Sequence, residues 1–205
     1  MKIKLFFLLF TLTVFSQSKI KLQTGDIIFQ KMNCGELCDA IHAVTKGYKD
    51  NDFSHLGLVL VENDSVFVIE AGGNAVRKVT LEQFSTYTKT TMFVGRLKRK
   101  YRKYIPQAIN FSLNQIGVPY DDDYLYDNGK YYCSELIYDA FLYAYEKPFF
   151  ELFPMTFKQP GKDEFFPVWI RYYENLDIKI PEGEPGCNPG GISTSDKLKI
   201  IGTIP

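Results

Sequence analysis

The stretch Tyr132-Cys133-Ser134-Glu135-Leu136, with the residues that follow it, constrains the fold of this chain more than any other part of the sequence. The apolar residues after the cysteine recur at the spacing of one helical face: Leu136, Ile137, Ala140, Phe141 and Ala144. Cys133 therefore lies in the first turn of a predicted helix, where unpaired backbone N–H groups and the positive end of the helix dipole stabilise a thiolate. The alternative is that Cys133 is a small buried apolar residue, a common role for cysteine.

The composition fits one domain and argues against a protein that binds nucleic acid. The chain has 205 residues, of which 45% are apolar, and this is sufficient for one hydrophobic core. Its 24 Lys and Arg residues equal its 24 Asp and Glu residues, whereas nucleic-acid-binding proteins usually carry a basic excess. The 14 Tyr and 17 Phe residues favour β-rich structure and a cleft lined by aromatic side chains.

The first 16 residues have the pattern of a signal peptide. Positive charge at Lys2 and Lys4 precedes an apolar stretch over residues 5–15, and Ser16 is a small residue at its end. This stretch is too short to span a bilayer comfortably and lacks charged stop-transfer flanks, so we expect cleavage rather than anchoring. Residues 17–205 then form the mature protein, a single domain that is exported and is periplasmic or secreted.

The four cysteines allow several disulfide patterns in an oxidising compartment. Cys34 and Cys38 are four residues apart, and on a regular helix a bridge between them is awkward without distortion. A pairing of Cys187 with Cys34 or with Cys38 is the open alternative. If Cys133 stays free, one of the other three cysteines is left without a partner.

Two adjacent predicted strands bring a histidine and a glutamate together. Residues 53–61 and 66–70 are rich in apolar and β-branched residues and flank a four-residue turn. Centring the hairpin between residues 63 and 64 places His55 opposite Gly72 and Gly57 opposite Glu70, so that His55 and Glu70 are diagonal neighbours on one face. A polar pair on an otherwise apolar hairpin requires an explanation, because unpaired buried polar groups are destabilising.

The other stretches complete a sheet with helices around it. Further strands are predicted at 27–29, 76–79 and 92–97, and helical segments at 35–45, 81–84 and 106–116. The segment 147–205 is rich in Phe, Tyr, Pro and Gly. Because Pro and Gly interrupt regular structure, we expect this segment to form loops that cover the domain rather than a second domain.

Three polar features receive structural interpretations. His42 lies among apolar neighbours in the helix predicted at 35–45 and is interpreted as a partly buried helix residue rather than a catalytic one. The basic cluster Arg96–Lys103 is interpreted as a solvated surface, with contact to an anionic envelope polymer or lipid headgroups as the alternative. The acidic run at 121–123 is interpreted as a solvated loop, because it lacks the glycine and distal glutamate of a calcium-binding loop. No metal site and no cofactor are predicted.

A cysteine at a helix start, a histidine at a strand start and a carboxylate on the neighbouring strand form a complete set for nucleophilic catalysis. Cys133 is the predicted nucleophile, His55 the acid–base that forms an ion pair with it, and Glu70 the group that orients the imidazole. The backbone N–H of Cys133 is one predicted donor to the oxyanion. The phenol of Tyr120, which reaches back from its loop, is the second.

These motifs resemble those of the permuted papain-like enzymes related to the NlpC/P60 superfamily, the YiiX-like group. The matching stretches are residues 24–29, 53–57, 68–71, 117–121 and 132–136. In ordinary NlpC/P60 enzymes the cysteine precedes the histidine, whereas here the histidine and glutamate come first, as in the permuted group. The resemblance implies an α+β papain-like fold in which the nucleophile helix packs on an antiparallel sheet that carries the histidine. It also implies thiol-dependent hydrolysis of an amide bond, in a peptide that could come from the cell wall.

Two other functions compete with this hypothesis. Relatives of the group include acyltransferases that act on lipids, so the first is a lipid-directed acyltransferase or phospholipase of the lecithin:retinol acyltransferase type. That function predicts a long apolar cleft near Phe149, Phe150, Phe153 and Trp169. The second is a non-catalytic wall-binding module, which a disulfide that consumes Cys133 would favour.

Overall fold

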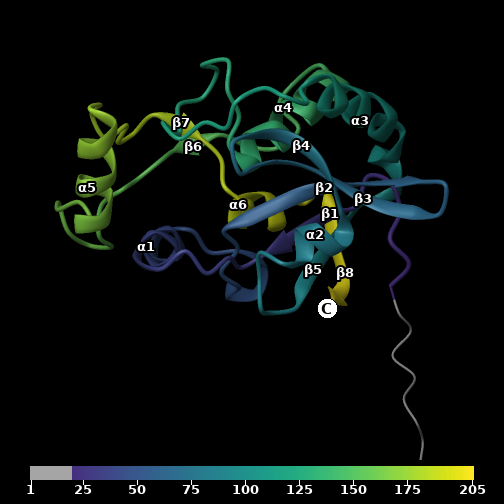
Figure 1. The fold of residues 1–205 in the computed structure, drawn as a ribbon, viewed down its shortest axis with the longest axis horizontal. Helices are drawn as coiled ribbons and strands as arrows, with labels where there is room; N and C mark the ends of the chain where they lie inside the picture. The colour runs from purple at the N-terminus through teal and green to yellow at the C-terminus, as the bar shows by residue number, and fades with distance from the viewer. Residues whose placement is uncertain (1–19) are drawn as a thin grey trace, which may run out of the picture.

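The computed structural model describes residues 20–205, and a six-stranded antiparallel sheet lies at the centre of the molecule (Figure 1). Its strands lie in the order β4-β3-β2-β1-β5-β8. Their bounds are β1 Ile27–Gln30, β2 His55–Glu62, β3 Ser65–Gly72, β4 Ala75–Thr80, β5 Met92–Leu97 and β8 Leu198–Ile204. The predicted α+β class with an antiparallel sheet is confirmed.

The predicted signal peptide, residues 1–16, lies outside the described residues.

Helices lie on the sheet and at one end of the molecule. The α-helices are α1 Glu36–Val44, α2 Leu81–Ser85, α3 Ile105–Asn114, α4 Cys133–Tyr145, α5 Pro167–Leu176 and α6 Pro189–Ser193. Two 3₁₀ segments, η1 Tyr48–Asp50 and η2 Arg99–Tyr104, and a small pair of strands, β6 Phe153–Pro154 and β7 Pro185–Gly186, complete the fold. Figure 1 shows α3 and α4 together near the sheet, with α5 at the far end of the molecule.

Alternate residues of the central strands face two separate cores. On one face, Leu58 and Ile69 pack in the same cluster as Leu136 of α4, and all three side chains are fully buried. On the opposite face, Val59 packs in a cluster with Phe84 of α2. Full burial of an aliphatic side chain contributes about 1.5–3 kcal/mol to stability. The apolar stripe of α4 therefore fixes the position of the helix on the sheet, and with it the position of Cys133.

The hairpin that carries the histidine and the glutamate has the predicted register. The β2–β3 ladder pairs Leu58 with Ile69 and Glu62 with Ser65, which centres the turn between Asn63 and Asp64. Asn63 and Asp64 both have positive φ, 46° and 62°, as a two-residue hairpin turn of type I′ requires. Since side chains alternate along each strand, this register directs His55 and Glu70 to the same face.

The segment 147–205 is more regular than expected. Strand β8 pairs with β5 from Met92–Ile204 to Leu97–Leu198 and so completes the central sheet. Helix α5 buries Trp169 against α1 at Ala40. The predicted loop-rich segment thus also contains short helices and strands, because apolar positions in these elements pack on the rest of the domain even though Pro and Gly separate them.

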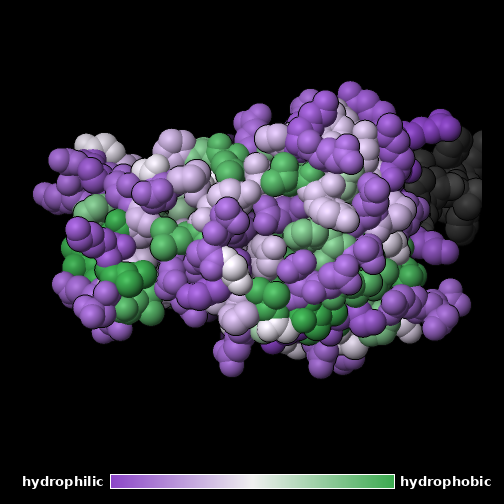
Figure 2. All heavy atoms as spheres, turned by 90° about the horizontal axis from the view of Figure 1, so that it is seen from above, coloured by the Kyte–Doolittle hydropathy of each residue, from purple (hydrophilic) through white to green (hydrophobic). Residues whose placement is uncertain are grey.

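The exposed side of α5 is partly apolar. Ile170 and Leu176 of α5, and Ile178 just after it, are 36–40% exposed, and Figure 2 shows hydrophobic side chains at the α5 end of the molecule. Over residues 20–205, no helix is both long enough and apolar enough to cross a bilayer.

A disulfide joins Cys34 to Cys38, with Cα atoms 5.2 Å apart. The bridge would be awkward on a regular helix, but α1 begins only at Glu36 and Cys34 precedes it. Gly35, between Cys34 and the helix, has a positive φ of 63°, so the two cysteines do not lie on one regular helix. Cys133 and Cys187 are free thiols in this structure, and the alternative pairing of Cys187 with Cys34 or Cys38 is therefore wrong.

Candidate active site

Cys133 is the first residue of α4, as predicted. Tyr132 is the N-cap, and its backbone N–H donates to the Glu135 carboxylate at 3.4 Å. The Cys133 sulfur lies 4.0 Å from the carbonyl oxygen of Ser54, the residue before β2. The thiol at the start of the helix is therefore held next to the start of the strand that carries His55.

His55 and Glu70 form a buried hydrogen-bonded pair. Nε2 of His55 lies 2.5 Å from Oε2 of Glu70, and the residues are 5% and 0% exposed. Burial alone would lower the pKa of His55, but interactions with Cys133 and with Glu70 outweigh it and raise that pKa to about 9. The imidazole is thus protonated at neutral pH, as an ion pair with a thiolate requires.

Arg77 is a partner of Glu70 that the sequence analysis missed. Its Nε donates to Oε1 of Glu70 at 3.0 Å. Burial opposes ionisation of Glu70, but hydrogen bonding and charge from His55 and Arg77 lower the pKa of Glu70 below its ordinary value. The β3–β4 ladder pairs Glu70 with Arg77. Extending the predicted hairpin by one strand, across the turn at 73–74, would have found this contact.

Aromatic side chains of the α2 region cover the same imidazole. The Phe84 ring centroid lies 5.5 Å from that of His55, and the Tyr87 ring lies edge-on at 6.3 Å. These rings restrict the orientations of His55 and keep water from its buried side, which strengthens the electrostatic interaction with Glu70.

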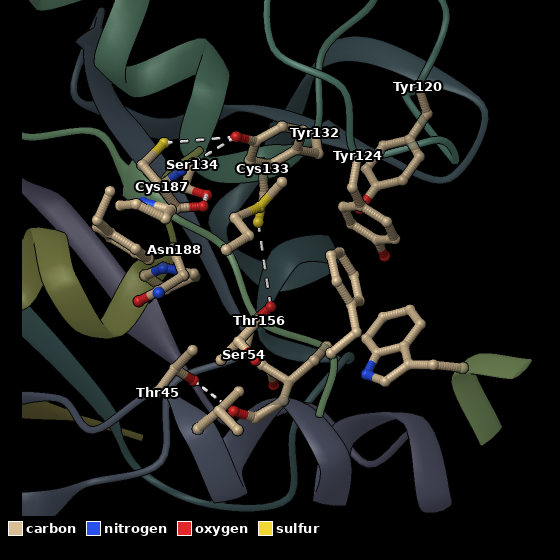
Figure 3. A pocket seen from close by; sticks show the side chains of 18 residues that line it. Thr45, Ser54, Tyr120, Tyr124, Tyr132, Cys133, Ser134, Thr156, Cys187 and Asn188 are labelled. Carbon is tan, nitrogen blue, oxygen red and sulfur yellow. Dashed lines mark hydrogen bonds between the residues drawn. The ribbon is translucent and has the colours of Figure 1, made fainter. Parts of the chain in front are cut away.

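A pocket of about 170 Å³ opens beside the Cys133 sulfur (Figure 3). By general packing estimates this volume holds on the order of ten water molecules. Among the described residues, none of the 18 that line the pocket is Asp, Glu, Lys or Arg. The lining residues are Ile41, Val44, Thr45, Ser54, Tyr120, Tyr124, Tyr132, Cys133, Ser134, Phe153, Pro154, Met155, Thr156, Phe157, Trp169, Cys187, Asn188 and Pro189.

Tyr120, the predicted oxyanion donor, lies in the wall of this pocket next to Tyr124 (Figure 3). Burial, followed by the neighbouring Tyr124 and Cys133, raises the pKa of Tyr120 well above its ordinary value. Its phenol therefore stays protonated and remains a hydrogen-bond donor. Tyr124, which the sequence analysis did not select, shares the wall with Trp169 at a ring-centroid distance of 5.9 Å.

Only part of the apolar cleft expected for a lipid-directed enzyme lies at this pocket. Phe153 and Trp169 line it. Phe149 and Phe150 instead lie in the main core, where Phe149 stacks on Phe141 at 5.0 Å. Phe149 and Phe150 also line a separate pocket together with Glu151, Asp196 and Lys197. The four residues of the expected apolar cleft are therefore divided between two pockets and do not line one cleft at the thiol.

Cys187 and Tyr132 attach the C-terminal segment to the start of α4. The Tyr132 hydroxyl accepts a hydrogen bond from the Cys187 backbone N–H at 3.1 Å. The Ser134 hydroxyl donates to the Cys187 carbonyl at 3.0 Å. Burial raises the pKa of the Cys187 thiol far above its ordinary value, so this second sulfur is a neutral thiol. Nothing in the spacing of the sequence indicated these contacts, which join residues 53–55 positions apart.

The other polar features have structural roles. His42 is buried in α1, and burial lowers its pKa. Arg96 is not simply part of a solvated cluster, since it forms a two-point ion pair with buried Asp26 at 2.7 and 2.8 Å. Asp121 is not solvated either. It is fully buried and accepts hydrogen bonds from two backbone N–H groups and from Asn128, and so organises its own loop.

A free thiol at the start of a helix that packs on an antiparallel sheet, close to a paired imidazole and carboxylate, defines the class of papain-like thiol enzymes. The chain belongs to the family described as "Permuted papain-like amidase enzyme, YaeF/YiiX, C92 family", whose profile matches residues 21–202. The protein is therefore a member of a cysteine amidase and peptidase family, and the predicted YiiX-like resemblance is confirmed.

Two relatives from Escherichia coli match this chain. The curated YiiX protein of strain K12 is 28% identical over 124 residues, which cover 58% of this chain and 57% of YiiX. The chain thus matches little more than half the length of that relative. A crystal structure of YiiX from strain O157:H7, titled as a metalloprotein, has a TM-score of 0.70 at 24% identity. It covers 89% of this chain and 97% of that one, and this likeness shows the fold.

Proposed function

We propose that this protein is an exported cysteine amidase that works through an acyl-enzyme on Cys133, with His55 as acid–base and Glu70 as the orienting carboxylate. The observation that carries the proposal is the buried His55–Glu70 pair at 2.5 Å beside the start of α4. A structural histidine in an apolar core has no need of an ionised carboxylate, since burying charge is destabilising.

In the proposed reaction the Cys133 thiolate attacks the amide carbonyl carbon, and His55 gives its proton to the departing amine as the C–N bond breaks. Water then attacks the thioester and passes a proton to neutral His55, and the C–S bond breaks to restore the thiolate. Glu70 holds the imidazole orientation through both steps. The Cys133 backbone N–H and the Tyr120 phenol are the proposed donors to the oxyanion.

The proposed substrate is an amide in a peptide, and the cell wall is the proposed source. The family supports an amide, and export supports a wall peptide. A second candidate, a lipid-directed acyltransferase or phospholipase, is favoured by the uncharged, largely aromatic walls of the pocket. Transfer of an acyl group from or to a lipid would use the same thioester on Cys133.

Export is supported by two independent features. The pattern of residues 1–16 is that of a signal peptide, and the Cys34–Cys38 disulfide is typical of an oxidising compartment. The proposed mature protein, 17–205, is one catalytic domain, since β8 of the segment 147–205 belongs to the same sheet as the His55 strand.

A metal does not fit the residues that the structure describes. The relative of known structure is called a metalloprotein in its title. Over residues 20–205, however, no group of three or more His, Cys, Asp or Glu side chains is arranged to hold a metal ion. We assign no residue of this chain to a metal and derive no step through one.

The test is to incubate the protein with envelope peptides and, separately, with envelope lipids, and to measure the mass of the intact protein. We expect an acyl adduct on Cys133 that is absent from Cys133→Ala, a variant that should keep the fold because it removes only the sulfur atom. An adduct from peptides supports the amidase, and an adduct from lipids alone supports the second candidate. No adduct from either, or equal labelling of Cys133→Ala, would refute the proposed nucleophile.

A further inference from the structure

We propose that Arg77 is a positioning residue of this site, which keeps Glu70 ionised and directed at His55 during the part of the cycle in which His55 is neutral. The inference rests on the proposed function, because it gives Arg77 a role within the Cys133–His55–Glu70 arrangement. Arg77 touches neither the pocket nor the thiol, so it acts only through Glu70.

The two oxygens of the Glu70 carboxylate are divided between two cationic partners. Oε2 bonds to Nε2 of His55 at 2.5 Å, and Oε1 accepts from Nε of Arg77 at 3.0 Å. Glu70 is 0% exposed, whereas the Arg77 side chain is 38% exposed. Arg77 therefore approaches from the solvent side, while the imidazole approaches from within the protein.

A second contact fixes the guanidinium. Its Nη2 donates to the Tyr87 hydroxyl at 2.7 Å, and the guanidinium carbon lies 5.5 Å from the centre of the Tyr87 ring. Tyr87 in turn lies edge-on to His55. Arg77, Glu70, His55 and Tyr87 thus form a closed ring of contacts, from β4, β3, β2 and the segment after α2.

The turn between β3 and β4 leaves room for this pair. A Cβ atom on Gly72 would lie 2.9 Å from Oε2 of Glu70, and one on Gly73 would lie 2.8 Å from Nη1 of Arg77. Gly73 also has a positive φ of 64°, which favours glycine. Any larger residue at either position would displace the carboxylate or the guanidinium.

The charges of the site explain why a second cation is needed. When His55 is protonated, the Glu70 carboxylate lies between two cations, the imidazolium and the guanidinium of Arg77. When the amine leaves, Cys133 is a neutral thioester and His55 has given up its proton. Arg77 is then the one charged group in contact with the buried Glu70 carboxylate among the described residues. Without Arg77, the buried Glu70 carboxylate would take up a proton. His55 would then lose the acceptor that orients its ring while water attacks the thioester.

The test separates formation of the acyl-enzyme from its hydrolysis, with 4-nitrophenyl butyrate as the probe. The burst of 4-nitrophenolate reports formation of the thioester, and the steady-state rate reports its hydrolysis. For Arg77→Gln we expect a burst close to the parent's and a steady-state rate lower by about ten-fold or more. This loss is a part of the ~10²–10⁴-fold rate acceleration that a well-placed acid–base group supplies. We also expect the acid limb of the steady-state rate to move to higher pH, and Arg77→Lys to recover part of the rate.

The matched control is Lys78→Gln, which removes one cation from the next position of β4, where Lys78 pairs with Glu62 at the surface. It should leave burst and steady state unchanged. An Arg77→Gln variant with the parent's steady-state rate, or with burst and steady state lowered in equal proportion, would overturn the positioning role. If Arg77→Gln does not fold, the uncharged variant Arg77→Met takes its place, and the same two outcomes in that variant would overturn the proposal.

A readout without substrate keeps this inference separate from the proposed function. Protonation of Glu70 at acid pH produces a step in the NMR shift of the His55 ring, and this step should lie at higher pH in Arg77→Gln than in the parent. An unmoved step overturns the role of Arg77 even if the enzyme turns over no probe. If the parent protein shows neither a burst nor an acyl adduct, the proposed function is refuted. A Glu70 protonation step that lies at higher pH in Arg77→Gln would still support the electrostatic role of Arg77.

Discussion

Replacement of Glu70 by Gln tests the electrostatics of the site most directly. The pKa of His55 is raised from 6.5 to about 9, and at 1.36 kcal/mol per pH unit this amounts to roughly 3 kcal/mol in favour of the imidazolium. This preference comes from Cys133 and from Glu70, net of the opposing effect of burial. Gln keeps the size of the side chain and an oxygen acceptor but removes the charge. Loss of an opposite charge at this distance lowers a pKa by about 1–3 pH units.

The assay is NMR titration of the histidine rings, which is simple because the chain has only two histidines. His42 serves as the internal reference, since burial lowers its pKa and it lies in α1, away from the hairpin. In the parent we expect the His55 signal to titrate near pH 9, as a property of the coupled His55–Cys133 pair. In Glu70→Gln it should titrate clearly lower, and in Glu62→Gln, at the exposed end of the same hairpin, it should not move.

The same substitution has a signed effect on stability. A folded pKa above the unfolded value stabilises the protein fully below about pH 6.5, and this contribution is lost as the pH rises through about 9. Glu70→Gln should therefore lower the free energy of unfolding at pH 6 more than at pH 10, by urea denaturation. A His55 signal that still titrates near pH 9 in Glu70→Gln would refute the assignment of Glu70 as its partner.

Three further predictions follow from other parts of the structure. A thiol-alkylating reagent should label Cys133 faster than Cys187, whose thiol burial keeps protonated; equal labelling, measured by peptide mass spectrometry, would count against the nucleophile. Trp169→Ala should raise KM for 4-nitrophenyl butyrate with little change in kcat, because Trp169 lines the pocket; an unchanged KM would show that the acyl group binds elsewhere. Replacing Cys34 and Cys38 by Ala should destabilise the fold by about 2 kcal/mol, the chain-entropy value for so short a loop, and thermal denaturation with and without reductant checks this.

The parts of the site that follow from local periodicity could be predicted from the sequence. The helical spacing after Cys133 predicted the thiol in the first turn of a helix, and Cys133 is the first residue of α4. Centring the predicted turn between residues 63 and 64 gave the register that relates His55 to Glu70. Both predictions use only residues that are near one another in the chain. Both are also well determined, because a one-residue shift in either pattern would move apolar side chains out of the core.

The contacts that could not be predicted are those that join distant segments. Cys187 reaches Tyr132 across 55 positions, and the pocket walls come from α1, the Tyr120 loop and the segment 153–189. Composition indicated aromatic residues in the last third of the chain but not which of them would face the thiol. Packing decided this, since Phe149 fills the core under α4 while Trp169, twenty positions later, reaches the pocket.

The two halves of the proposed site come from opposite faces of one sheet and meet where β2 begins. Cys133 is the first residue of α4, which packs on the face of Leu58 and Ile69. His55 instead packs against Phe84, which belongs to the core of the other face. The thiol and the imidazole therefore approach each other at the end of the sheet, where Gln30 and His55 form the last pair of the β1–β2 ladder. This arrangement fixes where the helix and the strand begin in space, but not which of them comes first along the chain. The site requires one helix start and one strand start at the same sheet end, and either connection between them satisfies that requirement.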